Sequence, residues 1–236
     1  MTAYKALMFD LDDTLYDFSG NWEQALVKTF GEHVLTAALD QPSVIAAFSH
    51  YSSLHSNLLY SGAITFDGYR FKRLASALAD FGIALGEPEF QDFNTTFIDN
   101  NLQLIQRNGD TVRQMARWAE VYKLGIITNG PADLAGEKLK RLGLDRFLPE
   151  EHVVVSQRTG YAKPLPEIFR YGLDRLGVQS HEAVFIGDSW EYDVEGAMGA
   201  GIAAIWISQT GEAAGNPRHH RPLGIIRHIG EAEQYL

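Results

Sequence analysis

Five short, uninterrupted apolar runs recur along the chain, at residues 6–9, 124–127, 152–155, 183–186 and 202–207. Runs of this length that do not alternate with polar residues are typical of strands buried on both faces of a parallel sheet. From residue 124 onward they alternate with helical patterns, which Pro131 and Pro166 begin and Gly143 and Gly177 end. Because helices join successive parallel strands through right-handed crossovers, the pattern predicts an α/β fold with a doubly wound, mainly parallel sheet.

Residues 17–106 break this rhythm, because they contain no β-branched apolar run. They offer helical patterns instead, at about residues 22–30, 43–60, 66–81 and 88–104, with Thr65 and Gly82 as the N-cap and the C-terminal stop of the third. A block of this length is too long for one crossover between neighbouring strands. We therefore predict two domains: an α/β core of residues 1–16 and 107–236, and an inserted helical domain of residues 17–106.

Composition and charge restrict the possible partners. The 236 residues carry a formal net charge of −10, which argues against binding to a nucleic acid polymer or an anionic membrane. The chain has no cysteine, so disulfides, thiolate nucleophiles and thiolate metal ligands are excluded. No apolar run is long enough for a membrane span and no signal peptide is visible, so we expect a cytoplasmic protein, monomeric or homodimeric. We expect the short basic stretch at residues 218–221 to be an exposed loop.

Polar residues that can carry chemistry follow the first four apolar runs. In chain order they are Asp10 and Asp12, then Thr128 and Asn129, then Lys163, and finally Asp188 with Asp193. Any one of them alone is an ordinary turn residue or surface residue. Because the carboxyl ends of parallel strands meet at one edge of the sheet, we expect the whole set to share one crevice. Clustered carboxylates without cysteine or clustered histidine favour a hard cation, Mg²⁺ first.

In their order and spacing these residues resemble the four motifs of the haloacid dehalogenase-like (HAD) superfamily. The matching segments are Asp10-x-Asp12-x-Thr14, Thr128, Lys163-Pro164 and Gly187-Asp188-Ser189-x-x-x-Asp193. The resemblance implies a Rossmann-like core. The inserted block is similar to the small helical cap domain that subfamily I members carry between the first two motifs. Within it, residues 61–65 followed by Arg70-Phe71 resemble the cap of the pyrimidine 5′-nucleotidase group, the house-cleaning nucleotidases.

The resemblance also implies a mechanism. Asp10 attacks phosphorus and forms an aspartyl-phosphate, while Asp12 protonates the leaving oxygen and later deprotonates water. The Asp10 carboxylate, the Asp12 backbone carbonyl and the Asp188 carboxylate hold Mg²⁺. The remaining roles are phosphate binding by Thr128 and the Asn129 backbone, a positive charge from Lys163 beside Asp10, and support of the site by Asp193.

Asp12 separates two reactions known in the superfamily, since the metal-free 2-haloacid dehalogenases lack this second aspartate. Its presence favours a phosphatase that acts on a small phosphorylated metabolite, and the nucleotidase-like cap favours a nucleoside 5′-monophosphate. Sugar phosphates, phosphoglycolate and flavin mononucleotide remain open as substrates. Phosphomutases share all four motifs, so a mutase stays an alternative, as does a non-catalytic protein that only accepts a phosphoryl group on an aspartate.

Overall fold

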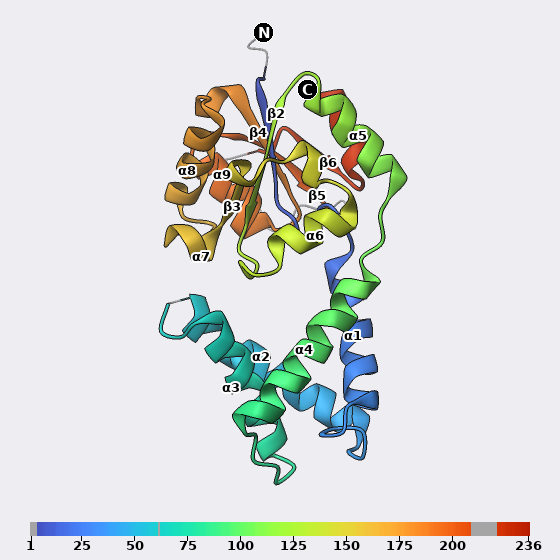
Figure 1. Ribbon diagram of the computed structural model, residues 1–236. Coiled ribbons are helices and arrows are strands. Elements are labelled where there is room, and N and C mark those ends of the chain that lie inside the picture. The colour runs from blue at the N-terminus through green and yellow to red at the C-terminus, as the bar shows by residue number, and fades with distance from the viewer. Residues whose placement is uncertain (1–3, 61, 209–220) are drawn as a thin grey trace. The chain divides into compact units, whose positions relative to one another are not determined.

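The computed structural model describes residues 4–60, 62–208 and 221–236 (Figure 1). The chain divides into two compact units, one made of Met1–Phe18 with Ile105–Leu236 and the other of Ser19–Leu104. We call them the α/β unit and the helical unit. Ser61 of the nucleotidase-like stretch and most of the basic stretch at 218–221 lie outside the described residues.

A six-stranded sheet, parallel throughout, forms the centre of the α/β unit. Its strands are β1 (Ala6–Phe9), β2 (Lys123–Thr128), β3 (Val153–Val155), β4 (Ala183–Gly187), β5 (Ala203–Ile207) and β6 (Gly224–Ile226). The apolar runs predicted the first five, and the doubly wound parallel sheet is confirmed. The short strand β6 was not predicted, because it has three residues, begins with glycine and exposes its middle side chain. The spatial order β3-β2-β1-β4-β5-β6 reverses direction between β1 and β4. Ligands of doubly wound sheets bind at such a switch point.

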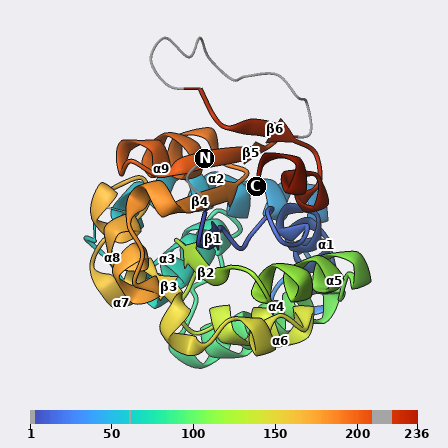
Figure 2. The same ribbon diagram turned by 90° about the horizontal axis from the view of Figure 1, so that it is seen from above.

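Helices cover both faces of this sheet. Figure 2 shows α8 and α9 on one side of the sheet and α5 and α6 on the other. Alternate residues of β1 serve the two faces: Met8 belongs to the core cluster that contains Phe169, and the ring of Phe9 stacks on Trp118 at 5.7 Å. The helices are α5 (Gly109–Ala119), α6 (Ala135–Leu142), α7 (Ser156–Thr159), α8 (Pro166–Leu176) and α9 (Gly196–Gly199). The 3₁₀-helices are η1 (Asp145–Phe147), η2 (Glu150–His152), η3 (Ser180–Glu182) and η5 (Ile229–Tyr235), and η4 (Trp190–Glu195) is a π-helix.

The predicted helix ends are largely correct. Gly143 and Gly177 stop α6 and α8 in the left-handed conformation, with φ of 71° and 62°, where a residue with a Cβ would be strained. Pro166 begins α8 as expected. The predicted start of α6 at Pro131 is wrong, since the helix begins at Ala135. The residues between Pro131 and Ala135 form turns, and the Ala132 N–H donates to the Gln157 side chain at 2.6 Å.

The helical unit contains α2 (Gln41–Tyr60), α3 (Phe66–Ala79), α4 (Glu87–Leu104) and all but the first residue of α1 (Phe18–Glu32). Thr65 caps α3 by accepting the Gly68 N–H at 3.1 Å, and Gly82 follows with a φ of 71°, both as predicted. Its core is rich in phenylalanine; Phe30, for example, packs edge-on against Phe48. Among the described residues of both units, none of the helices combines the length and the hydropathy that crossing a bilayer requires.

One arginine lies in this aromatic core. The guanidinium of Arg73 lies 4.8–4.9 Å from the ring centres of Trp22, Phe48 and Tyr69. Burial lowers the pKa of Arg73 to about 10, which leaves the side chain charged at neutral pH. The rings therefore stabilise a buried cation inside the helical unit.

Candidate active site

The chain makes a tight loop directly after β1, and this loop carries the first two predicted site residues. The Asp10 N–H continues the sheet by donating to the Ile186 carbonyl at 3.0 Å. Asp13 then adopts a left-handed conformation, with a φ of 59°, which aspartate tolerates better than most residues. The turn brings Tyr16 back beside Asp12, so that the tyrosine hydroxyl donates to Asp12 Oδ1 at 2.6 Å.

Lys163 joins Asp10 to Asp193 in a buried ion cluster. Its Nζ lies 2.5 Å from Asp10 Oδ1 and 2.6 Å from Asp193 Oδ1, and only 4% of the lysine side chain is exposed. Burial disfavours the ammonium, but the two carboxylates outweigh this effect and raise the pKa of Lys163 above its usual range. The lysine is therefore a permanent cation beside Asp10.

Two further contacts position Asp188, which comes directly after β4. The Thr14 hydroxyl donates to Asp188 Oδ1 at 3.1 Å, and the Trp206 indole N–H of β5 donates to the Asp188 carbonyl at 2.7 Å. The π-helix η4 then turns the chain back, so that Asp193 Oδ2 accepts the Ser189 N–H at 2.9 Å. Gly187 makes room for this turn, because a Cβ on it would lie 2.5 Å from Asp193.

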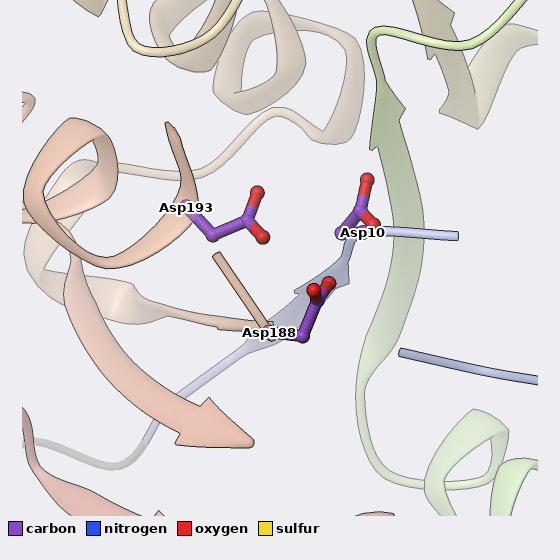
Figure 3. A group of neighbouring side chains, drawn as sticks. All are labelled: Asp10, Asp188 and Asp193. Carbon is purple, nitrogen blue, oxygen red and sulfur yellow. The ribbon is translucent and has the colours of Figure 1, made fainter. Parts of the chain in front are cut away.

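The carboxylates of Asp10, Asp188 and Asp193 gather at the edge of the sheet (Figure 3), where one oxygen of each lies within 4.8 Å of the others. Burial raises the pKa of Asp10 well above its usual range against the opposing charge of Lys163, and Asp193 and Asp12 add to the rise. Burial, reinforced by the Asp193 charge, raises the pKa of Asp188 to about 6. A metal cation bound between Asp10 and Asp188 would lower the pKa of both carboxyl groups and so favour their ionised forms.

The cluster fits a hard divalent cation through two of its three acids. Both oxygens of Asp193 already accept hydrogen bonds, from Lys163 and from the Ser189 N–H. Among the described residues, one oxygen of Asp10 and one of Asp188 accept no hydrogen bond from another residue. Carboxylate oxygens of this kind are the ligands that Mg²⁺ prefers.

Thr128, Asn129 and Gly130 form a loop at the end of β2. The Gly130 N–H donates to Thr128 Oγ1 at 2.9 Å, which leaves the threonine hydroxyl hydrogen to be donated elsewhere. The Asn129 side chain binds both backbone groups of Lys163, accepting from its N–H and donating to its carbonyl, each at 2.9 Å. Through these two hydrogen bonds the Asn129 side chain holds the backbone of Lys163 in place.

The structure brings all seven predicted site residues to one edge of the sheet. These seven residues are Asp10, Asp12, Thr128, Asn129, Lys163, Asp188 and Asp193. A Cβ on Gly130 would lie 3.1 Å from both Asp12 Oδ2 and Thr128 Oγ1, so the loop after β1 and the loop after β2 are in close proximity. Trp190, which follows Ser189, packs edge-on against Trp206.

Sequence reasoning missed Lys138, which lies on α6 and contacts Asp12. The lysine Nζ is 2.6 Å from Asp12 Oδ1 and 2.9 Å from Oδ2. A signal was present, because Lys138 occupies the apolar stripe of α6 with Ala135, Leu139 and Leu142. A lysine at a position that faces the core needs a partner, and the carboxylate of Asp12 supplies it.

Acids, a buried lysine and a threonine hydroxyl at the switch point of a parallel sheet are the groups that phosphoryl transfer requires: a nucleophile, an acid–base group and charge compensation. They are typical of an enzyme that transfers phosphoryl groups and is built on a parallel α/β sheet. The family model of the haloacid dehalogenase-like hydrolases matches residues 4–201, and the chain belongs to this family.

Curated relatives of the chain include phosphatases with different substrates. It is 30% identical over 213 residues to a glyceraldehyde 3-phosphate phosphatase of Methanopyrus kandleri, covering 86% of this chain and 83% of the relative. It is 27% identical over 241 residues to the pyrimidine 5′-nucleotidase YjjG of Escherichia coli, covering 98% and 96%.

Solved structures of the same fold cover nearly the whole chain. A magnesium-bound crystal structure of the HAD-hydrolase YfnB from Bacillus subtilis superposes with a TM-score of 0.77 at 23% identity, covering 98% of both chains. A 2-haloacid dehalogenase from Pseudomonas syringae superposes with a TM-score of 0.72 at 26% identity, covering 98% of this chain and 97% of that one.

Proposed function

We propose that the protein is a Mg²⁺-dependent phosphatase that hydrolyses a small phosphomonoester, a nucleoside 5′-monophosphate, through an aspartyl-phosphate on Asp10. The observation that carries the proposal is the paired arrangement after β1. Asp10 is held by Lys163, and Asp12, two residues on, is held separately by Lys138 and Tyr16. Two carboxylates in different environments suit two different roles.

In this mechanism Asp10 attacks phosphorus in line, and the ester oxygen leaves with a proton from Asp12. The Thr128 hydroxyl and the Asn129 backbone bind phosphoryl oxygens, while Lys163 keeps a positive charge beside the nucleophile. Asp12 then takes a proton from the water that cleaves the aspartyl-phosphate. The Asp10 carboxylate, the Asp12 carbonyl and the Asp188 carboxylate would hold Mg²⁺, which supplies compensation for the phosphoryl charge. Asp193 supports the site by fixing Lys163.

The two named relatives support two substrate classes. The nucleotidase covers almost the full chain and agrees with the nucleotidase-like stretch around Gly62, which favours a nucleoside monophosphate. The glyceraldehyde 3-phosphate phosphatase is slightly more identical and favours a triose or sugar phosphate as the second candidate. We further propose that residues 17–106 are the cap domain and decide this choice. Exchanging them for the cap of a phosphatase with another substrate should then transfer the ranking of substrates by kcat/KM.

A panel of phosphorylated metabolites tests the proposal. Purified enzyme with Mg²⁺ is incubated with pyrimidine nucleoside 5′-monophosphates, glyceraldehyde 3-phosphate, phosphoglycolate, flavin mononucleotide and p-nitrophenyl phosphate, and inorganic phosphate is measured. Release of phosphate that stops with excess EDTA is expected, and a product with relocated phosphate would indicate a mutase. Chloride release from a 2-chloro acid in EDTA, without any phosphate release from the panel, would replace the proposal with a dehalogenase.

A further inference from the structure

Lys138 is a buried cation whose charge is matched by one acid. Only 3% of its side chain is exposed, and its ammonium lies 4.8 Å from the ring centre of Phe18 and 5.9 Å from that of Tyr16. Burying an ammonium is costly unless it is paired and hydrogen-bonded. A leucine in this apolar stripe would stabilise the core without that cost. A role in holding Asp12 accounts for the lysine better than packing does.

Within the part of the chain that the structure describes, the contacts around Asp12 leave one direction open. A carboxylate has about four acceptor sites. Tyr16 fills one on Oδ1, and Lys138 bridges both oxygens. The remaining site therefore belongs to Oδ2. This atom faces the loop at the end of β2, because a Cβ on Gly130 would lie 3.1 Å from it and equally close to Thr128 Oγ1. Lys138 and Tyr16 together turn the open site of Asp12 toward the residues proposed to bind phosphate.

We propose that Lys138 is a positioning residue for proton transfer by Asp12, and that the site is accordingly built for alkyl phosphate esters. This inference rests on the proposed phosphatase function. An alkoxide is a poor leaving group, so its departure depends on a proton delivered at a fixed point. An aryl ester such as p-nitrophenyl phosphate leaves as a stable anion and does not need the proton.

The proton moves twice in one turnover. In the first step an Asp10 oxygen forms a bond to phosphorus, the P–O bond of the ester breaks, and the leaving oxygen takes the electron pair together with the proton of Asp12 Oδ2. The products are the free alcohol, the aspartyl-phosphate and the Asp12 carboxylate. In the second step water attacks phosphorus and gives its proton to Asp12 Oδ2, while the bond to Asp10 breaks. Phosphate leaves, and both aspartates return to their starting states.

The test compares Lys138→Met with wild type on two substrates: p-nitrophenyl phosphate and the alkyl ester of the panel that the wild-type enzyme hydrolyses fastest. For the alkyl ester, kcat/KM is expected to fall by about 10²-fold, the usual contribution of a positioned acid or base. For p-nitrophenyl phosphate, kcat/KM is expected to stay within about threefold of wild type, whereas kcat falls because the second step still needs Asp12. A burst of p-nitrophenol should therefore precede the steady state.

Two variants serve as controls. Lys138→Arg keeps a bidentate cation and should restore most of the alkyl-ester rate. Lys140→Met makes the same substitution at an exposed position of the same helix and should behave as wild type. If Lys138→Met does not fold, Tyr16→Phe removes another donor to Asp12 and decides by the same comparison of the two substrates.

Equal losses of kcat/KM on both substrates, without a burst, would overturn the role of Lys138 and leave the phosphatase proposal standing. Failure of the wild-type enzyme to release phosphate from any ester would instead overturn the phosphatase function, and the inference about Lys138 with it.

Discussion

Replacing Lys163 with methionine should lower the stability of the α/β unit, and added Mg²⁺ should restore part of the lost stability. The lysine ammonium is the charge between Asp10 Oδ1, at 2.5 Å, and Asp193 Oδ1, at 2.6 Å. The side chains of these acids are only 9% and 1% exposed. Methionine fills nearly the same space but carries no charge, so Lys163→Met leaves both carboxylates without their counter-ion.

The expected cost follows from this burial. Removing one partner of a buried ion pair costs about 3–5 kcal/mol, because the other charge stays buried and unpaired. For a chain of this length 1 kcal/mol corresponds to about 2–4 °C in Tm, so the variant should melt roughly 6–20 °C lower. The cost is largest at neutral and higher pH. Asp10 and Asp188 already have raised pKa values, so acidification lets the folded state take up protons before the unfolded chain does, and this recovers stability.

Thermal unfolding followed by circular dichroism at pH 7.5 in EDTA measures this loss of stability. The proteins compared are wild type, Lys163→Met and, as the control at an exposed position, Lys140→Met. Added Mg²⁺ should raise the Tm of Lys163→Met more than that of wild type, since the variant has more uncompensated negative charge for the cation to bind. A loss below about 1 kcal/mol in EDTA, or no recovery on acidification to pH 5, would refute the reasoning that Lys163 neutralises a buried carboxylate cluster.

Three further outcomes are expected. Asp10→Asn should retain less than about 1% of wild-type phosphate release with an unchanged circular dichroism spectrum, because an amide cannot act as the charged nucleophile. Gly130→Ala should lower kcat about tenfold with little loss of stability, because the added Cβ would lie 3.1 Å from Asp12 Oδ2. Its control is Gly136→Ala, where the added Cβ meets nothing within 4 Å; this variant should raise the free energy of unfolding by about 0.5–1 kcal/mol and leave kcat unchanged. The apparent dissociation constant for Mg²⁺, measured by calorimetry, should rise about tenfold per pH unit below pH 6, because a proton on Asp188, whose pKa is raised to about 6, competes with the cation.

The first five strands and the place of the candidate site were predictable from the sequence for a simple reason. A strand buried on both faces must be apolar throughout, so β1 and β4 stand out as uninterrupted runs. In a parallel sheet every strand ends at the same edge. Asp10 and Asp188, far apart in the sequence, were therefore expected to lie together, and the structure places their carboxylates in one cluster.

The contacts that orient these residues were not predictable in the same way. Lys138 and Asp12 are 126 positions apart, and their pairing depends on how α6 is rotated and how far it slides along the sheet. The same holds for Trp206. The apolar run around it predicts a buried position, but not the hydrogen bond from its indole N–H to the Asp188 carbonyl. Apolar periodicity specifies which side of an element is buried, and it carries no information on which polar atom lies opposite.

Local patterns thus determined the elements, the topology class and the set of chemical groups, because helix ends, buried strands and turn residues depend on neighbours in sequence. The resemblance implied that Lys163 lies beside Asp10, but only tertiary packing showed that Lys163 also pairs with Asp193 and that Lys138 holds Asp12. The physical reason is that a buried charge must find its partner within a few ångströms in space, and that partner can lie anywhere along the chain.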